Sequence, residues 1–189
     1  IDDIEILCKA VKEVSPSTYI MVDNCYGEFV ETKEPCAVGA DLVIGSLIKN
    51  AGGGIARTGG YIAGRADLIE HCAYRLTSPG IGRESGCTLN ILREFYQGLF
   101  LAPHTVLQAK KTAMYAAAMC EQIGCSASPA ADAPRYDIIE ALTIFIDGPE
   151  EFVGLGTLAI ASLYLRCCNL KRYNLFALNL GCCRCILGT

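Results

Sequence analysis

The stretch that decides the fold reads YIMVDNCYGEFVE at residues 19–31 and DLVIGSLIKNAGGGIARTGGYIAG at residues 41–64. Three short apolar runs within it have the length and β-branched content of buried strands. They cover residues 19–22, 42–47 and 61–63. Asp23 ends the first run, and Lys49 follows the second, just before three consecutive glycines. The stretch therefore predicts a buried sheet that presents an acid and a lysine at its strand ends.

Helical patterns surround these strands. Apolar residues at helical spacing, acidic first turns and the placement of Gly and Pro set the expected boundaries. The helices expected are residues 2–14, 66–76, 88–100, and one that Pro103 opens at its first turn and that ends near residue 123. A long loop is expected at residues 77–86. The order helix, strand, loop, strand, loop, strand, helices indicates an α/β fold.

The chain after residue 124 changes character. Residues 125–134 are rich in small residues and are expected to be a linker, and residues 136–146 fit either a strand or a helix. Residues 152–165 form an uncharged run that is too short to span a membrane, so a buried segment is expected there. Residues 166–189 lack clear periodicity. We therefore divide the chain at residues 1–124, 125–150 and 151–189, and the last part is an unassigned, cysteine-rich tail.

Composition narrows the class of protein. Apolar residues make up 52% of the 189 residues, charged residues make up 19%, and the net charge is −4. These values predict a sizeable core and argue against nucleic acid as the main partner. No charged-then-apolar leader is visible, and most of the 12 cysteines are scattered singly, which is typical of a reducing compartment. We expect a cytoplasmic protein without a membrane segment.

Four residues of the opening stretch suggest a cofactor site. A carboxylate at a strand end, Asp23, can hold a protonated ring nitrogen, and Lys49 can form a Schiff base if its surroundings favour the neutral amine. Ser46 and Tyr26 can donate hydroxyl hydrogen bonds, and the glycines at 52–54 can form a backbone nest for a phosphate. These are the parts that pyridoxal phosphate requires.

Each part alone has a more ordinary interpretation. A strand-end Asp is more often a turn residue, and a lone Lys is usually solvated. The glycine run at residues 52–60 lacks the Lys-Ser/Thr ending of a P-loop and the spacing of a dinucleotide fingerprint. The tail cysteines match no common zinc module, so no metal site is expected. The conjunction of acid, tyrosine, serine, lysine and glycines favours the cofactor interpretation over a nucleotide-binding α/β module.

Four separated blocks then resemble one protein family in the same order. They are VDNCYGEFVE at 22–31, GADLVIGSLIKNAGGGIARTGGYIAGR at 39–65, AYRLTSPGIGRE at 73–84 and YQGLFLAPH at 96–104. Together they resemble the aluminium-resistance protein family, a branch of fold-type-I pyridoxal-phosphate enzymes related to methionine γ-lyase and cystathionine β-lyase. The resemblance covers residues 2–139.

The resemblance implies roles for the candidate residues. It implies Lys49 as the Schiff-base lysine, Asp23 as the partner of the pyridine nitrogen, Ser46 near the phosphate and Tyr26 near the cofactor's O3′. It also implies that residues 1–124 are the central part of an aminotransferase-like large domain. The family assembles as homo-oligomers with active sites at subunit contacts, so a homo-oligomer is implied here too.

Two departures from the family pattern affect the expected activity. Prolines are usual in the family at the positions of Ala51 and Arg57. The family's phosphate cup and the aromatic residue that stacks on the ring come from an upstream part that this chain does not match. We expect a pyridoxal-phosphate-dependent carbon–sulfur lyase acting on a small sulfur-containing amino acid, incomplete as this chain. The alternatives are a non-catalytic fragment of such an enzyme and, less favoured, the nucleotide-binding module.

Overall fold

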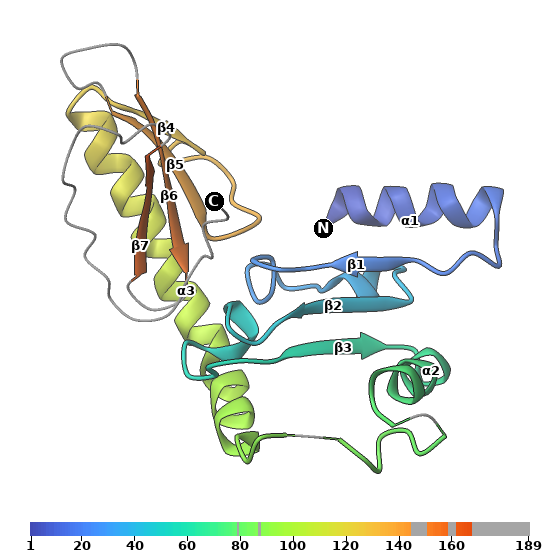
Figure 1. The fold of residues 1–189 in the computed structure, drawn as a ribbon. Helices are drawn as coiled ribbons and strands as arrows, with labels where there is room; N and C mark the ends of the chain where they lie inside the picture. The colour runs from blue at the N-terminus through green and yellow to red at the C-terminus, as the bar shows by residue number, and fades with distance from the viewer. Residues whose placement is uncertain (79, 87, 145–150, 159–161, 168–189) are drawn as a thin grey trace.

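A computed structural model describes residues 1–78, 80–86, 88–144, 151–158 and 162–167 of the chain. At residue 144 and in the last two ranges it describes the backbone alone. Figure 1 shows two β-sheets joined by a long helix, α3 (Leu92–Gln122). The mixed α/β composition expected from the sequence is confirmed.

The first sheet contains the strands expected in the opening stretch. Its order is β1 (Met21–Asp23), β2 (Leu42–Ser46) and β3 (Gly60–Gly64). β1 and β2 run parallel, with Asp23 opposite Ile44, and β3 is antiparallel to β2. The connection from β1 to β2 is made of turns and a short 3₁₀ helix, η1 (Pro35–Val38). Two parallel strands place their carboxyl ends at one edge, which is the arrangement a strand-end site needs.

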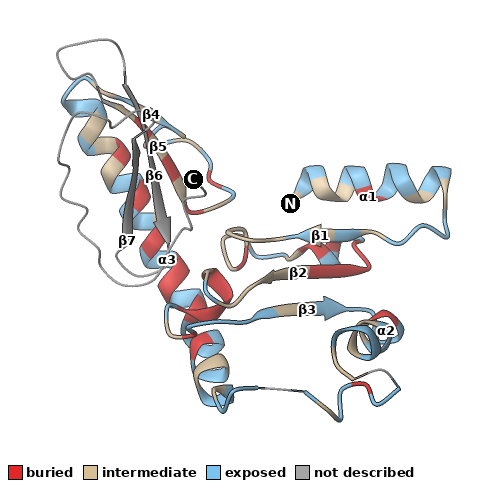
Figure 2. Ribbon diagram, in the orientation of Figure 1, coloured by how far each residue is buried: buried red, intermediate tan, exposed pale blue. Residues whose placement is uncertain are grey.

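The expectation that all three strands are buried is wrong. Leu42 and Val43 of β2 are buried, but Met21 in β1 is 60% exposed and most of β3 is exposed or half-buried. Figure 2 shows the buried residues gathered in β2, in the turn that follows it and along α3. Apolar content alone does not show which strands are covered by other elements. In the described chain, the buried strand residues of this sheet lie in the central strand, β2.

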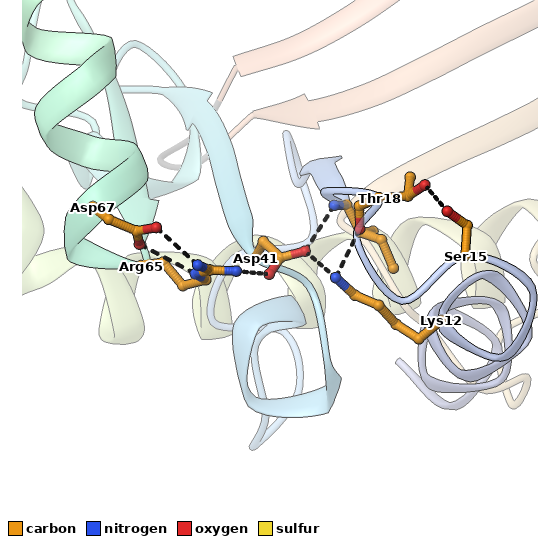
Figure 3. Close-up of polar contacts among 7 residues, drawn as sticks. Lys12, Ser15, Thr18, Asp41, Arg65 and Asp67 are labelled. Atoms are coloured by element: carbon orange, nitrogen blue, oxygen red, sulfur yellow. Dashed lines mark hydrogen bonds and ion pairs between the residues drawn. The ribbon is translucent and has the colours of Figure 1, made fainter.

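Asp41, just before β2, joins three separate elements. Its carboxylate accepts hydrogen bonds from Lys12 Nζ of helix α1 (Asp2–Val14) at 2.8 Å and from the backbone N–H of Ile20 at 2.9 Å. Its other oxygen accepts from Arg65 Nη1 at 3.1 Å. Arg65 also binds Asp67 in the first turn of α2 (Ala66–Leu76). Figure 3 shows this chain of charges, which fixes the start of the strand that ends beside the candidate site.

This network predicts a pH-dependent loss of stability. The Lys12 ammonium, the Ile20 N–H and the Arg65 guanidinium lower the pKa of Asp41 from 3.8 to about 2. Because the folded pKa lies below the unfolded one, the stabilisation is complete above pH 4 and is lost as the pH falls toward 2. After allowance for the partly exposed cations, Asp41→Asn should lower the free energy of unfolding by about 1–2 kcal/mol at neutral pH.

Urea unfolding at pH 7, 5, 3 and 2 measures this effect. The difference between Asp41→Asn and the wild type should shrink below pH 4. Asp67→Asn is the control because Asp67 is exposed and touches Arg65 at the outer end of the network. Equal losses for the two variants at every pH would contradict the role given to Asp41.

α3 is one helix where the sequence suggests two. Residues 88–100 and a second helix opening at Pro103 were expected, but α3 runs unbroken from Leu92 to Gln122 with Pro103 inside it. An interior proline removes one helical hydrogen bond and costs about 3 kcal/mol. Packing offsets this cost, because the small side chains of Ala102, Ala109 and Ala113 are almost fully buried. Tertiary contacts thus override the local signal.

The second sheet corrects the expectation of a linker. β4 (Ser126–Ser128) lies inside residues 125–134 and pairs antiparallel with β5 (Ile139–Ile144). β5 settles the open choice at residues 136–146 as a strand. The uncharged run is not one segment, because it contributes to β6 (Glu151–Leu158) and β7 (Ser162–Cys167). Residues 168–189 of the cysteine-rich tail lie outside the described residues.

Candidate active site

The candidate residues gather at the carboxyl edge of the β1–β2 pair. Asp23 ends β1, Ser46 ends β2, and Lys49 follows Ser46 by three residues, with its N–H donating to the Ser46 carbonyl at 3.3 Å. The backbone N–H of Asn24 donates to the Ile44 carbonyl at 2.9 Å, which keeps the two strand ends together. The structure therefore brings the acid and the lysine to one edge, as the sequence predicts.

Tyr26 is one side-chain partner of Lys49. The Lys49 ammonium lies over the Tyr26 ring, with Nζ 4.5 Å from the ring centroid. Tyr26 sits in a tight turn at φ 74°, and Phe29 of the same turn has φ 62°. Such left-handed backbone is uncommon for bulky residues and persists where surrounding contacts fix it. Here the contacts come from α3 and residue 138, because Tyr26 and Phe29 pack on Val106, Ala109 and Ile138.

The charges of Asp23 and Lys49 influence each other. The backbone N–H of Cys25, which donates to Asp23 at 3.0 Å, lowers the pKa of that carboxyl most, and the Cys25 thiol and Lys49 lower it further. Asp23 is exposed, so the argument that it needs a partner because it is buried does not hold. Its charge is instead stabilised by the turn that follows it.

Lys49 keeps its proton in these surroundings. Partial burial lowers the pKa of Lys49, but Tyr26 and Cys25 together outweigh this, so the pKa lies above the ordinary value of 10.5. The condition set by the sequence argument, surroundings that favour the neutral amine, is not met by the described residues alone. The amine must therefore release a proton before it can attack a carbonyl carbon.

The glycines after Lys49 pack against α3 and do not form the expected anion nest. The N–H groups of Gly52 and Gly53 donate to the Lys49 and Asn50 carbonyls inside a short 3₁₀ helix, η2 (Asn50–Gly52). The turn is buried, and a Cβ on Gly98 of α3 would lie 2.2 Å from the Gly52 carbonyl oxygen. Thr105 also donates to the Gly53 carbonyl at 3.3 Å. These glycines allow backbone to approach backbone, and this contact fixes the Lys49 loop.

Gly98→Ala tests this close approach. The added methyl group meets backbone that cannot move aside without shifting either the helix or the loop, so the variant should lose about 1–3 kcal/mol of unfolding free energy. This loss is expected although alanine favours helix by up to about 1 kcal/mol. Gly86→Ala is the control, because its Cβ would meet only Thr77 Cγ2 at 3.7 Å. Equal melting temperatures for Gly98→Ala and Gly86→Ala would contradict the contact.

A buried polar group behind the site was missed by the sequence argument. Glu28 is 3% exposed and accepts a hydrogen bond from the Tyr61 hydroxyl at 3.0 Å. Asn50 is fully buried, and its side-chain amide donates to the Glu28 backbone carbonyl at 3.1 Å. Both residues directly border the motifs already singled out. Their signal in the sequence was only that polar residues interrupt apolar runs beside Tyr26 and Lys49.

Other candidates do not join this edge. Arg57, whose guanidinium could bind a carboxylate, pairs with Glu94, with Nη2 2.5 Å from Oε1. Three further arginines are exposed; they are Arg75, Arg83 and Arg93. Among the residues whose placement is described, no three His, Cys, Asp or Glu side chains could hold a metal ion together, and no helix is long and apolar enough to cross a membrane.

Comparison with known proteins identifies the family. The sequence profile described as methionine gamma-lyase matches residues 1–155 of this chain. The chain therefore belongs to the methionine γ-lyase family, and the resemblance found in the sequence is confirmed.

Individual relatives agree with this assignment. The uncharacterised protein YnbB of Bacillus subtilis is 54% identical over 142 residues, which are 75% of this chain and 34% of that protein. An uncharacterised 33.9 kDa protein of Lactobacillus delbrueckii is 51% identical over 153 residues, or 81% of this chain and 49% of that protein. The chain thus spans a third to a half of the length of these curated relatives.

Solved structures also resemble this chain over part of their own length. A Listeria monocytogenes protein, provisionally named a cystathionine β-lyase involved in aluminium resistance, is 55% identical with a TM-score of 0.72, over 75% of this chain and 36% of that one. A Clostridium novyi carbon–sulfur lyase involved in aluminium resistance is 40% identical with a TM-score of 0.74, over 85% and 44%. A methionine γ-lyase from Micromonospora echinospora, 19% identical with a TM-score of 0.54, shares the fold.

Proposed function

We propose that this chain carries the lysine-bearing part of a pyridoxal-phosphate-dependent carbon–sulfur lyase that acts on a small sulfur-containing amino acid. One observation carries the proposal. In a chain of the methionine γ-lyase family, Asp23 ends β1, Lys49 lies three residues after the end of the parallel strand β2 at the same edge, and Tyr26 lies against Lys49. Such a site needs a primary amine and an acid in one place, supported by rigid backbone.

The residues present fit this cofactor. Lys49 offers an amine for the aldehyde carbon, and Asp23 offers a carboxylate whose lowered pKa keeps it ionised for a pyridinium nitrogen. Ser46 and Tyr26 add hydroxyl donors on the same edge. Close to Lys49 in the chain and in the hydrogen-bond network, Glu28 Oε2 and Asn50 Oδ1 are buried polar atoms that find no hydrogen-bond partner among the described residues. The donor set is therefore suited to a charged, heteroaromatic aldehyde.

In the proposed reaction the protein side chains hold, orient and move protons. The Lys49 amine would hold the cofactor, and when free it would remove the α-proton of the substrate. The Asp23 carboxylate would bind the protonated ring nitrogen. When bound, pyridoxal phosphate supplies the electron sink that lets a thiol leave from the β or γ carbon.

Further features of the proposal follow from the family and the sequence. We propose that residues 1–124 belong to a fold-type-I large domain, and that the active protein is a homo-oligomer. The free cysteines of the described chain, such as the buried Cys8, support a cytoplasmic location. The acidic net charge of −4 supports a function without nucleic acid or membrane partners.

A second candidate is a form of the same protein that does not bind the cofactor alone. It is favoured by the exposure of Asp23 and by the share of the relatives, 34% and 49%, that this chain spans. An exposed carboxylate contributes little to the binding of a cation in water. The two candidates differ in where the remaining cofactor contacts come from.

The deciding experiment compares two proteins. One is the 189-residue chain, and the other is a chimera in which the chain replaces the aligned stretch of the Listeria monocytogenes relative. Each is incubated with pyridoxal phosphate, reduced with borohydride and mapped by mass spectrometry. Adduct on Lys49 in the chimera supports the enzyme, and adduct in the chimera alone supports the second candidate. Adduct on Lys9, Lys12 or Lys33 in place of Lys49 refutes the assignment.

A further inference from the structure

Glu28 stands out among the buried groups that the proposed reaction does not use. It lies in the turn at residues 24–30, two residues after Tyr26, and is 3% exposed. Its Oε1 accepts from the Tyr61 hydroxyl at 3.0 Å, while its Oε2 is buried and has no hydrogen-bond partner among the described residues. A buried carboxylate with one oxygen unpaired is costly when ionised, and the same group is far less costly when a proton sits on that oxygen.

The surrounding strands are shaped for this side chain. A Cβ on Gly45 of β2 would lie 2.5 Å from Glu28 Oε1 and 2.4 Å from Tyr61 Cε1. Gly45 pairs with Tyr61 across the β2–β3 ladder, so the glycine opens the space in which the acid and the phenol meet. Any larger residue at position 45 would close that space. The packing thus selects a hydrogen-bonded Glu28–Tyr61 pair.

Glu28 also connects the two segments that flank Lys49. Its backbone carbonyl accepts from Asn50 Nδ2 at 3.1 Å, and Asn50 directly follows Lys49. On the other side, its own turn carries Tyr26, whose ring lies 4.5 Å from Lys49 Nζ. Asn50 Oδ1, in the same hydrogen-bond network, is a buried acceptor without a donor. A proton on Glu28 would remove the charge from this buried carboxyl group.

We propose that Glu28 is a positioning residue for Lys49: as a neutral carboxylic acid it fixes the turn at residues 24–30 and so keeps Tyr26 against the lysine. This inference rests on the proposed function for its catalytic meaning, since it describes how the reactive amine is held. The stacking itself is a property of the chain alone. Glu28 does not touch the reacting atoms and acts through Tyr26 and Asn50.

The electrostatic surroundings agree with a neutral acid. Burial raises the pKa of Glu28 and is the largest effect; backbone N–H groups in its own turn and the Tyr61 hydroxyl oppose it, and the charge of Glu34 adds a smaller rise. Tyr61, the titratable group on β3, has a raised pKa through burial and Glu28, so it remains a phenol and a donor. Glu34 and Cys25 are the other titratable groups that raise the pKa of Tyr61.

Glu28→Gln is the informative variant, because glutamine reproduces a neutral acid with an acceptor and a donor. Since the folded pKa of Glu28 lies above the unfolded value of 4.5, the wild type loses stability as the pH rises through the folded pKa. The glutamine variant lacks this loss. Its urea midpoint should match the wild type at pH 4 and exceed it at pH 8, while Glu70→Gln, on the exposed side of α2, should show no such difference.

A second readout reports on Lys49 directly. The 189-residue chain is methylated with formaldehyde and borohydride at pH 7.5, and the rate at Lys49 is followed by peptide mass spectrometry. Glu28→Ala should release Tyr26 and raise this rate about two- to fivefold, as expected for loss of a cation–π contact. Glu28→Gln should keep the wild-type rate. The control, Glu70→Ala, should also keep it.

The outcomes separate this inference from the proposed function. Neither readout contains cofactor, so failure of pyridoxal phosphate to react with Lys49 leaves both results standing. Wild-type methylation in Glu28→Ala, or a Glu28→Gln variant less stable than the wild type at pH 8, would overturn the role of Glu28 while leaving the lysine assignment intact. If Glu28→Ala does not fold, the pH comparison of Glu28→Gln with the wild type still tests the role of Glu28. The methylation rates of Glu28→Ala, Glu28→Gln and Glu70→Ala are then measured in the chimera.

Discussion

Lys49→Ala is expected to abolish both covalent trapping of pyridoxal phosphate and thiol release from a sulfur-containing amino acid in the chimera. The reason is chemical, because the variant has no amine at the edge where Asp23 and Tyr26 lie. A nucleophile that forms a covalent bond cannot be replaced by its neighbours. Borohydride reduction followed by peptide mapping measures the first loss, and a thiol reagent measures the second.

The matched control is Lys33→Ala, which removes an exposed lysine from the connection between β1 and β2. It should retain both signals. The environment of Lys49 adds a pH dependence to the same assay. Because its pKa is raised above 10.5, the neutral amine is scarce at neutral pH, and the trapping rate should increase as the pH rises toward 10. Trapping that is independent of pH would show that the cofactor or the rest of the chimera changes the pKa of the Lys49 amine.

Asp23→Asn is expected to lower thiol release in the chimera by orders of magnitude while covalent trapping on Lys49 persists. Asparagine keeps the shape of the side chain but loses the charge that holds a proton on a pyridine nitrogen. A charge-assisted hydrogen bond contributes about 1.5–3 kcal/mol, and a neutral ring is also a poorer electron sink. The turn should survive, because an amide oxygen can still accept from the Cys25 N–H.

Steady-state turnover and the absorbance of bound cofactor, measured on the same samples, separate the two effects. Asp67→Asn is the control for a lost exposed carboxylate elsewhere in the chain. Turnover near the wild-type rate in Asp23→Asn would remove Asp23 from the site. Loss of both turnover and trapping would instead show that Asp23 is needed to build the site.

The strands and the site edge were predictable because their signals are local. Alternating turns and apolar runs located the first sheet, and Lys49 and Asp23 stand where those runs end. Pro103 misled the prediction because a local helix-start signal cannot report the packing that carries α3 through it. β4 was missed for a related reason, since three small residues show little β propensity until β5 pairs with them.

The polar network behind Lys49 was not predictable from spacing. Glu28 and Tyr61 are 33 positions apart and meet because a glycine of β2 leaves room between them. Asp41, Lys12 and Arg65 meet in the same way from three elements. Partners that are distant in sequence depend on the folded topology, and a single sequence records only that each residue is polar. The anion nest failed because the glycines were needed for close packing with α3.

The long helix also has a mechanical consequence. α3 is in contact with η2 near its first third and with β4 and β5 toward its end. At 1.5 Å per residue, Gln122 lies about 36 Å along the axis from Gly98, so a tilt of about 5° about Gly98 moves the far end by about 3 Å. In such a tilt Gly98, which contacts the loop after Lys49, would move far less than Gln122, so the geometry would reduce the displacement that the Lys49 loop receives from the second sheet.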